Sequence, residues 1–371
     1  MPYHLLLHFD SDAFGGRRRP KEVEGGGVDH YDLGYVNNVV QDEVLAQWRT
    51  VSAQEAAELD PRFVFPRKTL AAGENCTLGE DDPDRILAQK NGYAEYSNGR
   101  INVKTLLQVP GGINFTTGNI LFVGDLVVHG AVSTGFSLQA RNIMVKGTIG
   151  GASVTAQGSV IAESGVKGAK EAVLTAGKNI RVPFCENARL VAGESLFVDG
   201  ACMHCDLYVG KQIAVKTRLI GGDCYCHRLM YVKEQLGGGI ATETNVTLGF
   251  DPLLLLKAND LDETLVGQTQ RVADLEALLR RHPELVDEYG GKLEKARKRL
   301  NVLNKQRQTL EDAIVAGDVG PSCALAVPGE VRAGVTVSIG NAYYSVMETL
   351  RDVRFTLAGD EIVVSSPAMK K

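Results

Sequence analysis

A four-residue motif recurs through the middle of the chain, with a polar residue first and an aliphatic residue second. It reads NIMV, SVIA, NIRV, SLFV, QIAV and, more loosely, LMYV. Alternation within each copy indicates a strand with one buried face. A near-constant period across copies indicates strands that stack on one another, so the sequence predicts a parallel β-helix. The second residues of the copies are Ile143, Val160, Ile180, Leu196, Ile213 and Met230, at steps of 17, 20, 16, 17 and 17.

A second column of apolar residues precedes the first by six positions. Glycine contributes 41 of the 371 residues and recurs at similar places in each copy, where corners of the helix need backbone that only glycine adopts without strain. Alternation upstream places the start of the solenoid between Ile101 and Ile113. The second column contains Val154, Leu174, Leu190, Leu207 and Cys224, and the recurrent glycines are Gly158, Gly177, Gly193 and Gly210.

The hydrophobic pattern changes to a period of three and four after the segment VTLGFDP. Two apolar stripes follow, separated by RRHPELVDEYGG, with Asp251 and Pro252 suited to begin the first helix and His282 and Pro283 to end it. We therefore predict an antiparallel helical hairpin inserted into the solenoid. The later alternation of VRAGVTVSI and the segment RFTLAGDEIVV predict strands that complete and cap the solenoid.

These patterns predict a mainly β protein with four segments. The first is a small α+β domain, in which HYDLGYVNNVVQDEVLAQWRTVSAQEAAELD reads as helix or mixed structure. The second is the parallel β-helix, the third is the helical hairpin, and the fourth contains the strands that complete the β-helix. The predicted ranges are 1–100, 101–251, 252–317 and 318–371.

Composition excludes several classes of function. The formal net charge of −5 provides no basic field for a nucleic-acid backbone, so we expect no nucleic-acid partner. No apolar run approaches the ~20 residues that span a bilayer, and we expect no membrane span. Seven cysteines without the spacing of a small secreted protein, and an N-terminus without a basic signal-peptide region, predict a reduced cytoplasmic protein.

Cysteines are concentrated in two segments of the repeat, CMHC and CYCH. Several of them stand in columns otherwise filled by alanine, valine, leucine and glycine, so we interpret them as small apolar residues in the solenoid wall. The alternative is a zinc site with ligands one rung apart. We predict no metal and no cofactor, and the alternative ligands are Cys202, Cys205, Cys224, Cys226 and His227.

Enzymatic function is the main competing hypothesis, because carbohydrate-active lyases and hydrolases also use β-helices with acidic residues along a groove. Short rungs and an aromatic content of 6% disfavour it. Phosphate-binding, serine-hydrolase and metalloprotease motifs are missing from the sequence, and we predict no catalytic residues. The candidate acids of the alternative, an enzyme or a polysaccharide-binding protein, are Glu186, Asp199, Asp206 and Asp223.

Several ordered segments resemble the β-solenoid family of flagellar assembly protein A. They include GGINFTTGNILFVGDLVVHGAV, CENARLVAGESLFVDGACMHCDLYVGKQIAVK, RLIGGDCYC, TNVTLGFDP and VPGEVRAGVTVSIGN, and the likeness extends from Pro61 to Val364. Thr116 to Asn119, Glu186 to Ala188, and Gly221 with Gly222 resemble the family most closely, and we interpret them as turns that define the fold. His204 and Cys205 stand where the family often has His-Ser.

The resemblance implies a right-handed β-helix with an inserted coiled coil, preceded by a separate N-terminal domain. It carries no catalytic motif, and it implies a cytoplasmic bacterial scaffold or regulator, in some lineages tied to flagellar assembly. We therefore expect protein partners of a flagellar or regulatory kind, and homo-oligomerisation stays open. The proline-rich and glycine-rich segment typical of the family's N-terminal domain is not found in residues 1–60.

Overall fold

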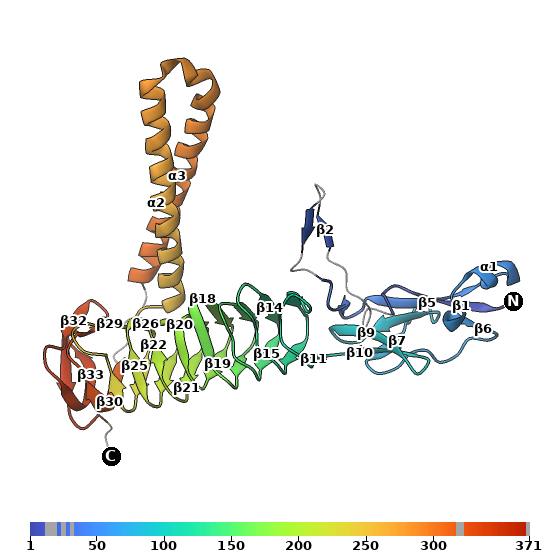
Figure 1. Ribbon diagram of the computed structural model, residues 1–371, viewed down its shortest axis with the longest axis horizontal. Coiled ribbons are helices and arrows are strands. Elements are labelled where there is room, and N and C mark those ends of the chain that lie inside the picture. Colours follow the sequence, from blue (N-terminus) through green and yellow to red (C-terminus); the bar gives the residue numbers. More distant parts are fainter. Residues whose placement is uncertain (12–20, 24–26, 30–32, 317–322, 369–371) are drawn as a thin grey trace. The chain divides into compact units, whose positions relative to one another are not determined.

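The computed structural model describes residues 1–11, 21–23, 27–29, 33–316 and 323–368. The chain divides into two compact units, Met1–Arg189 and Leu190–Lys371. Strands β11 to β34 belong to one hydrogen-bonded sheet that winds as a β-solenoid, and two long helices are inserted into it (Figure 1). The predicted mainly β fold with a helical insertion is therefore confirmed. The handedness of the winding and coiled-coil packing of the helices remain predictions.

The first unit begins with three small sheets. Antiparallel pairing gives the order β6-β1-β5-β8-β7 in one, β10-β9-β4 in another and β2-β3 in the third. Leu5, Trp48 and Ile86 are buried in the core shared by the first two. The elements are β1 (Tyr3–Leu7), β2 (Lys21–Val23), β3 (Gly27–Asp29), β4 (Asn38–Val39), β5 (Val44–Thr50), α1 (Ala53–Glu58), η1 (Pro61–Phe63), β6 (Val64–Phe65), β7 (Cys76–Leu78), β8 (Arg85–Ala88), β9 (Gly92–Ser97) and β10 (Arg100–Lys104).

Solenoid strands follow in the same unit, each pairing in parallel with the strand one rung away. Ile143 lies beside Leu126 and Val160, and Val154 lies beside Leu138 and Leu174, as the repeat predicts. The strands are β11 (Leu106–Val109), β12 (Ile120–Leu121), β13 (Asp125–Val128), β14 (Ser137–Ala140), β15 (Asn142–Val145), β16 (Ser153–Ala156), β17 (Val160–Ala162), β18 (Val166–Ala176), β19 (Asn179–Val182) and β20 (Cys185–Ala192).

The second unit continues the same columns. Ile213 lies beside Leu196 and Met230, and all three side chains are buried. The strands before the insertion are β21 (Ser195–Val198), β22 (Cys202–Met203), β23 (Asp206–Val209), β24 (Gln212–Val215), β25 (Arg218–Ile220), β26 (Gly222–Cys226), β27 (Leu229–Val232), β28 (Gln235–Leu236) and β29 (Thr244–Leu248).

Two helices of 30 residues each form the insertion, α2 (Pro252–Arg281) and α3 (Val286–Val315), joined by η2 (Pro283–Leu285). Asp251 caps α2 by accepting a hydrogen bond from the Leu253 backbone N–H at 2.8 Å, which confirms the predicted helix start. The helices run side by side (Figure 1). The predicted boundary between residues 317 and 318 lies outside the described residues.

The strands after the insertion resume the solenoid and then reverse. β30 pairs in parallel with β27 and β28, and β31 pairs in parallel with β29, so the rungs continue across the insertion. β32 pairs antiparallel with β31, and β33 pairs antiparallel with β30 and β34, so the segment RFTLAGDEIVV forms a hairpin. The bounds are β30 (Ala324–Val331), β31 (Val335–Ile339), β32 (Ala342–Ser345), β33 (Leu350–Ala358) and β34 (Glu361–Ser365).

Candidate functional site

Two features of the described chain carry side-chain chemistry beyond packing: a corner of the solenoid lined by cysteines, and the base of the helical hairpin. Both arise from the repeat of 17 residues. The corner depends on residues with left-handed backbone, and the hairpin base depends on side chains that point outward from the rungs.

The corner is marked by a column of residues with positive φ. Lys170, Asn187, His204 and Gly221 have φ of 68°, 49°, 52° and 71°, and each is 17 positions after the one before it. Left-handed backbone reverses the side on which the following residues lie, so the chain turns the corner there. Gly118, from the Thr116 to Asn119 segment, also has a left-handed φ of 72°. Each segment interpreted as a turn contains a residue with left-handed backbone, although Glu186 to Ala188 lie within strand β20. That these segments define the fold stays a prediction.

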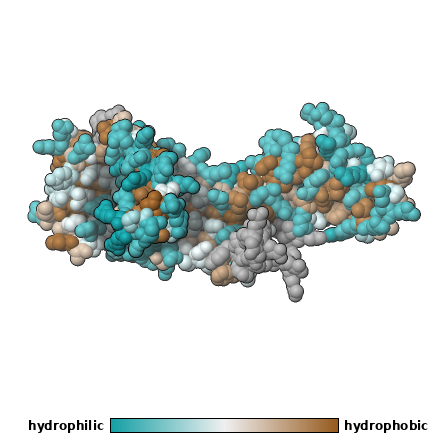
Figure 2. Space-filling view, turned by 90° about the horizontal axis from the view of Figure 1, so that it is seen from above, coloured by the Kyte–Doolittle hydropathy of each residue, from teal (hydrophilic) through white to brown (hydrophobic). Residues whose placement is uncertain are grey.

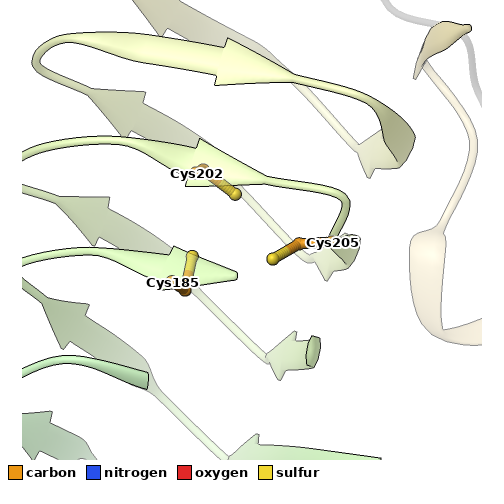
Figure 3. A group of neighbouring side chains, drawn as sticks. All are labelled: Cys185, Cys202 and Cys205. Atoms are coloured by element: carbon orange, nitrogen blue, oxygen red, sulfur yellow. The ribbon is translucent and has the colours of Figure 1, made fainter. Parts of the chain in front are cut away.

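Three cysteines meet inside this corner. Cys185 begins β20, Cys202 begins β22, and Cys205 lies between β22 and β23. Their sulfur atoms all lie within 4.8 Å of one another, and the three residues are 0%, 1% and 0% exposed. Figure 3 shows the three side chains pointing toward one another. Cys202 and Cys205 flank the left-handed His204, so both side chains enter the interior.

The predicted alternative ligands therefore divide into two groups. Cys202 and Cys205 come together with Cys185. Across the part of the chain that the structure describes, Cys224, Cys226 and His227 belong to no cluster of three or more possible metal ligands.

Cys224 and Cys226 stand in the wall columns. Cys224 pairs with Leu207 and Val246, and Cys226 pairs with Val209 and Leu248. Burial raises the pKa of the Cys224 thiol well above its usual value, and nearby Cys205 adds to the rise. Burial also raises the pKa of Cys226 to about 11. These two thiols are therefore protonated at neutral pH and behave as small apolar groups.

Cys185 is the member of the cluster that sequence reasoning did not single out. It stands 17 residues before Cys202, the step of one rung, so the repeat places the two in one column. The same column continues to Leu219, which pairs with Cys202. The spacing was therefore visible in the sequence, whereas the inward turn of Cys205 was not.

The base of the hairpin rests on outward-facing aromatic residues of the solenoid. Tyr208 on β23 and Tyr225 on β26 are register partners, and their rings stack with centroids 4.9 Å apart. Asn259 of α2 donates a hydrogen bond from Nδ2 to the Tyr208 hydroxyl at 3.2 Å. Tyr208 is 4% exposed, and burial raises the pKa of Tyr225 to about 12. The hairpin is therefore held at its base by specific contacts.

Polar contacts also join the two helices along their length. Arg307 lies 2.6 Å from Asp262, and Arg297 lies 2.7 Å from Glu276. Gln268 donates a hydrogen bond to the Ala296 carbonyl at 2.9 Å. Figure 2 looks onto the free end of the hairpin, whose surface is mainly hydrophilic. The ion pairs and the hydrogen bond between α2 and α3 hold the two helices together as one hairpin.

A groove of about 550 Å³ opens between the helices in the half of the hairpin nearer the solenoid. Apolar side chains line it, including Leu261, Leu310 and the half-exposed Val302, together with two lysines. Its lining residues are Lys257, Leu261, Val302, Lys305, Gln306, Thr309 and Leu310.

Two of the four acidic residues of the enzyme alternative have polar partners among neighbouring side chains. Asp199 forms an ion pair with Lys216 at 2.6 Å, and Asp223 accepts a hydrogen bond from Asn245 at 2.9 Å. Glu186 precedes the left-handed Asn187 at the corner. The enzyme alternative stays a hypothesis.

Comparison with known families decides the relationship of the chain. A family model described as the flagellar assembly protein A β-solenoid domain matches residues 105–362. The chain belongs to this family. A search of curated proteins found no match, and a search of solved structures found none either.

The flagellar assembly protein A match covers the solenoid strands, the hairpin and the strands that follow it. It begins at residue 105, later than the expected Pro61, so strands β1 to β10 lie outside it. The family description connects the solenoid domain with flagellar assembly. Among the described residues, neither long helix is apolar enough over its length to cross a bilayer.

Proposed function

We propose that this protein is a cytoplasmic, non-enzymatic scaffold that binds protein partners in flagellar assembly. Membership of the flagellar assembly protein A family supports the cellular process. Cys185, Cys202 and Cys205, whose sulfurs lie within 4.8 Å of one another, support a reducing compartment, because thiols this close together oxidise outside one.

The observation that carries the proposal is the helical arm with its apolar groove. Two long helices seated on the solenoid present this groove in the half of the hairpin nearer the solenoid. Apolar side chains that line the groove, including Val302 at 55% exposure, suit the apolar stripe of a partner helix. Lys257 and Lys305, which also line the groove, suit acidic residues beside that stripe. We therefore propose an amphipathic helix with acidic flanks as the bound element.

The test compares charge substitutions at two exposed valines of the hairpin. V302E places a carboxylate in the groove, whereas V266E places one at a residue outside the groove lining that is 72% exposed. Purified variants are cross-linked in a lysate of the native host, and captured proteins are identified by mass spectrometry. We expect the native chain and V266E to capture the same flagellar assembly component and V302E to lose it.

Two results would argue against the proposal. Equal capture by all three proteins would remove the groove from the binding surface. Failure of the native chain to capture any flagellar component would contradict the partner-binding function itself. Circular dichroism of each variant establishes that the hairpin remains helical.

A further inference from the structure

The convergence of three buried thiols goes beyond partner binding and does not depend on it. Cys185, Cys202 and Cys205 come from consecutive rungs, and their sulfurs point into one space within 4.8 Å of one another (Figure 3). We propose that these three residues form a binding site for one thiophilic metal ion with a filled d shell, Zn²⁺ or Cu⁺.

The arrangement differs from that of the other cysteines in the wall. Cys224 and Cys226 each have leucine or valine as partners in their columns. The cluster instead uses two positions of the corner. Cys202 lies two residues before the left-handed His204, and Cys205 lies one residue after it. At the rung above, Leu219 and Gly222 occupy these positions. Cysteine occupies both positions in the rung of Cys202 and Cys205. The preceding rung adds Cys185 in the same column as Cys202.

The geometry suits a metal ion bound by three sulfurs. An ion about 2.3 Å from each of three sulfurs holds them about 4 Å apart in a trigonal arrangement. The three sulfurs already lie within 4.8 Å of one another, so binding an ion requires only a small inward movement of the thiols. In the present arrangement, the Cys205 thiol is 3.2 Å from the Met203 carbonyl, to which it donates. Metal binding would replace thiol protons and release them.

The chemistry of the donors selects the class of ion. Thiolates prefer Zn²⁺ and Cu⁺ over the hard cations that carboxylates bind, and the described cluster contains sulfur ligands alone. Three ligands suit the low coordination number of Cu⁺, whereas the charge of Zn²⁺ balances more of the negative charge of three buried thiolates. Both ions would link adjacent rungs at the corner.

Burial determines how the site would be loaded. The three residues are at most 1% exposed, so an ion enters as the chain folds. The full-length protein is therefore unfolded without oxygen, refolded with Zn²⁺, with Cu⁺ or without metal, and passed over a desalting column with a competing chelator. Elemental analysis then gives the metal content per chain.

We expect about one ion per chain in the native sequence and a higher melting temperature than that of the metal-free protein. The variants C185S, C202S and C205S should each retain almost none. The matched control C224S/C226S removes two equally buried thiols outside the cluster and should retain the ion. Co²⁺ provides a second readout, because thiolate ligands give it charge-transfer absorption that the control keeps and the cluster variants lose.

Three outcomes would overturn the proposal. The native chain would hold no more of either ion than C202S, the control would lose the ion together with the cluster variants, or the Co²⁺ spectrum would lack thiolate bands. Cys-to-Ala versions of the same variants replace any serine variant that fails to refold. Preferential retention of Cu⁺ or of Zn²⁺ supports the site and identifies its ion.

Discussion

Asn259 of helix α2 donates a hydrogen bond to the hydroxyl of Tyr208 on solenoid strand β23, with Nδ2 and Oη 3.2 Å apart. The two residues are 51 positions apart in the chain, and the contact joins the insertion to the rung that it covers. Tyr208 is 4% exposed because α2 lies over it. An isolated pair of helices buries little surface, so the contacts between α2 and β23 determine where the hairpin attaches to the solenoid.

Removal of the Tyr208 ring should weaken the base of the hairpin. We expect Y208A to lower the free energy of unfolding by about 3 to 5 kcal/mol, because a large buried aromatic side chain is lost. Y208F keeps the ring and loses only the hydrogen bond, for about 0.5 to 1.5 kcal/mol. Denaturant unfolding measures both, and hydrogen exchange in α2 should rise much more in Y208A. Equal effects of the two substitutions would show that the ring contributes little.

Alkaline pH should destabilise the protein through Cys226. Burial raises its pKa from 9.0 to about 11 in the folded chain. The unfolded state therefore loses this proton first as pH rises, and the free energy of unfolding falls between about pH 9 and about pH 11. A shift of this size corresponds to about 2 to 3 kcal/mol.

The control for Cys226 is C226V, because valine and leucine occupy the same column at Val209 and Leu248. Urea unfolding at a series of pH values should show a smaller fall for C226V than for the native chain over this interval. Parallel curves for the two proteins would mean that Cys226 titrates alike in the folded and unfolded states.

Helix α2 contains a glycine whose replacement should stabilise the protein. A Cβ built on Gly267 meets no atom within 4 Å, and the residue lies in the interior of the helix. We expect G267A to raise the free energy of unfolding by about 0.5 to 1 kcal/mol, because alanine restricts the unfolded chain and favours the helix. Denaturant unfolding tests this, and a loss of stability would indicate that the glycine serves a contact that α2 makes elsewhere.

The solenoid was predictable because each rung repeats one pattern at nearly one period. Ile143 beside Val160 and Ile213 beside Met230 follow directly from the steps of 17 residues. The hairpin was predictable because Asp251 and Pro252 begin a helix and Pro283 cannot continue one. Both inferences use local information that a single strand or helix carries.

The candidate sites were less predictable because they depend on contacts between elements. Cys205 turns inward only because His204 takes a left-handed conformation, and the sequence does not specify that φ for histidine. The alignment of Tyr208 with Tyr225 follows from the repeat period. The contact of Asn259 with Tyr208 depends on the direction in which α2 leaves the solenoid, which the sequence pattern does not give. In the N-terminal region, Val44–Thr50 is a strand, and Ser52 begins a helix of only six residues. Pairing with β1 and β8 determined that outcome.

The corner itself provides the most demanding test of the fold. Gly222 has φ of 89°, and a Cβ at this residue would lie 2.2 Å from the Cys205 carbonyl oxygen one rung away. Because backbone atoms cannot move aside without displacing the rung, we expect G222A to lower the free energy of unfolding by at least about 3 kcal/mol. Gly239 is the matched control, since its φ is 104° and a Cβ there meets nothing within 4 Å. G239A should therefore show only backbone strain of about 1 to 2 kcal/mol. Denaturant unfolding of both variants separates the two contributions, and equal losses would mean that left-handed strain, not the close approach of the rungs, makes glycine necessary at this corner.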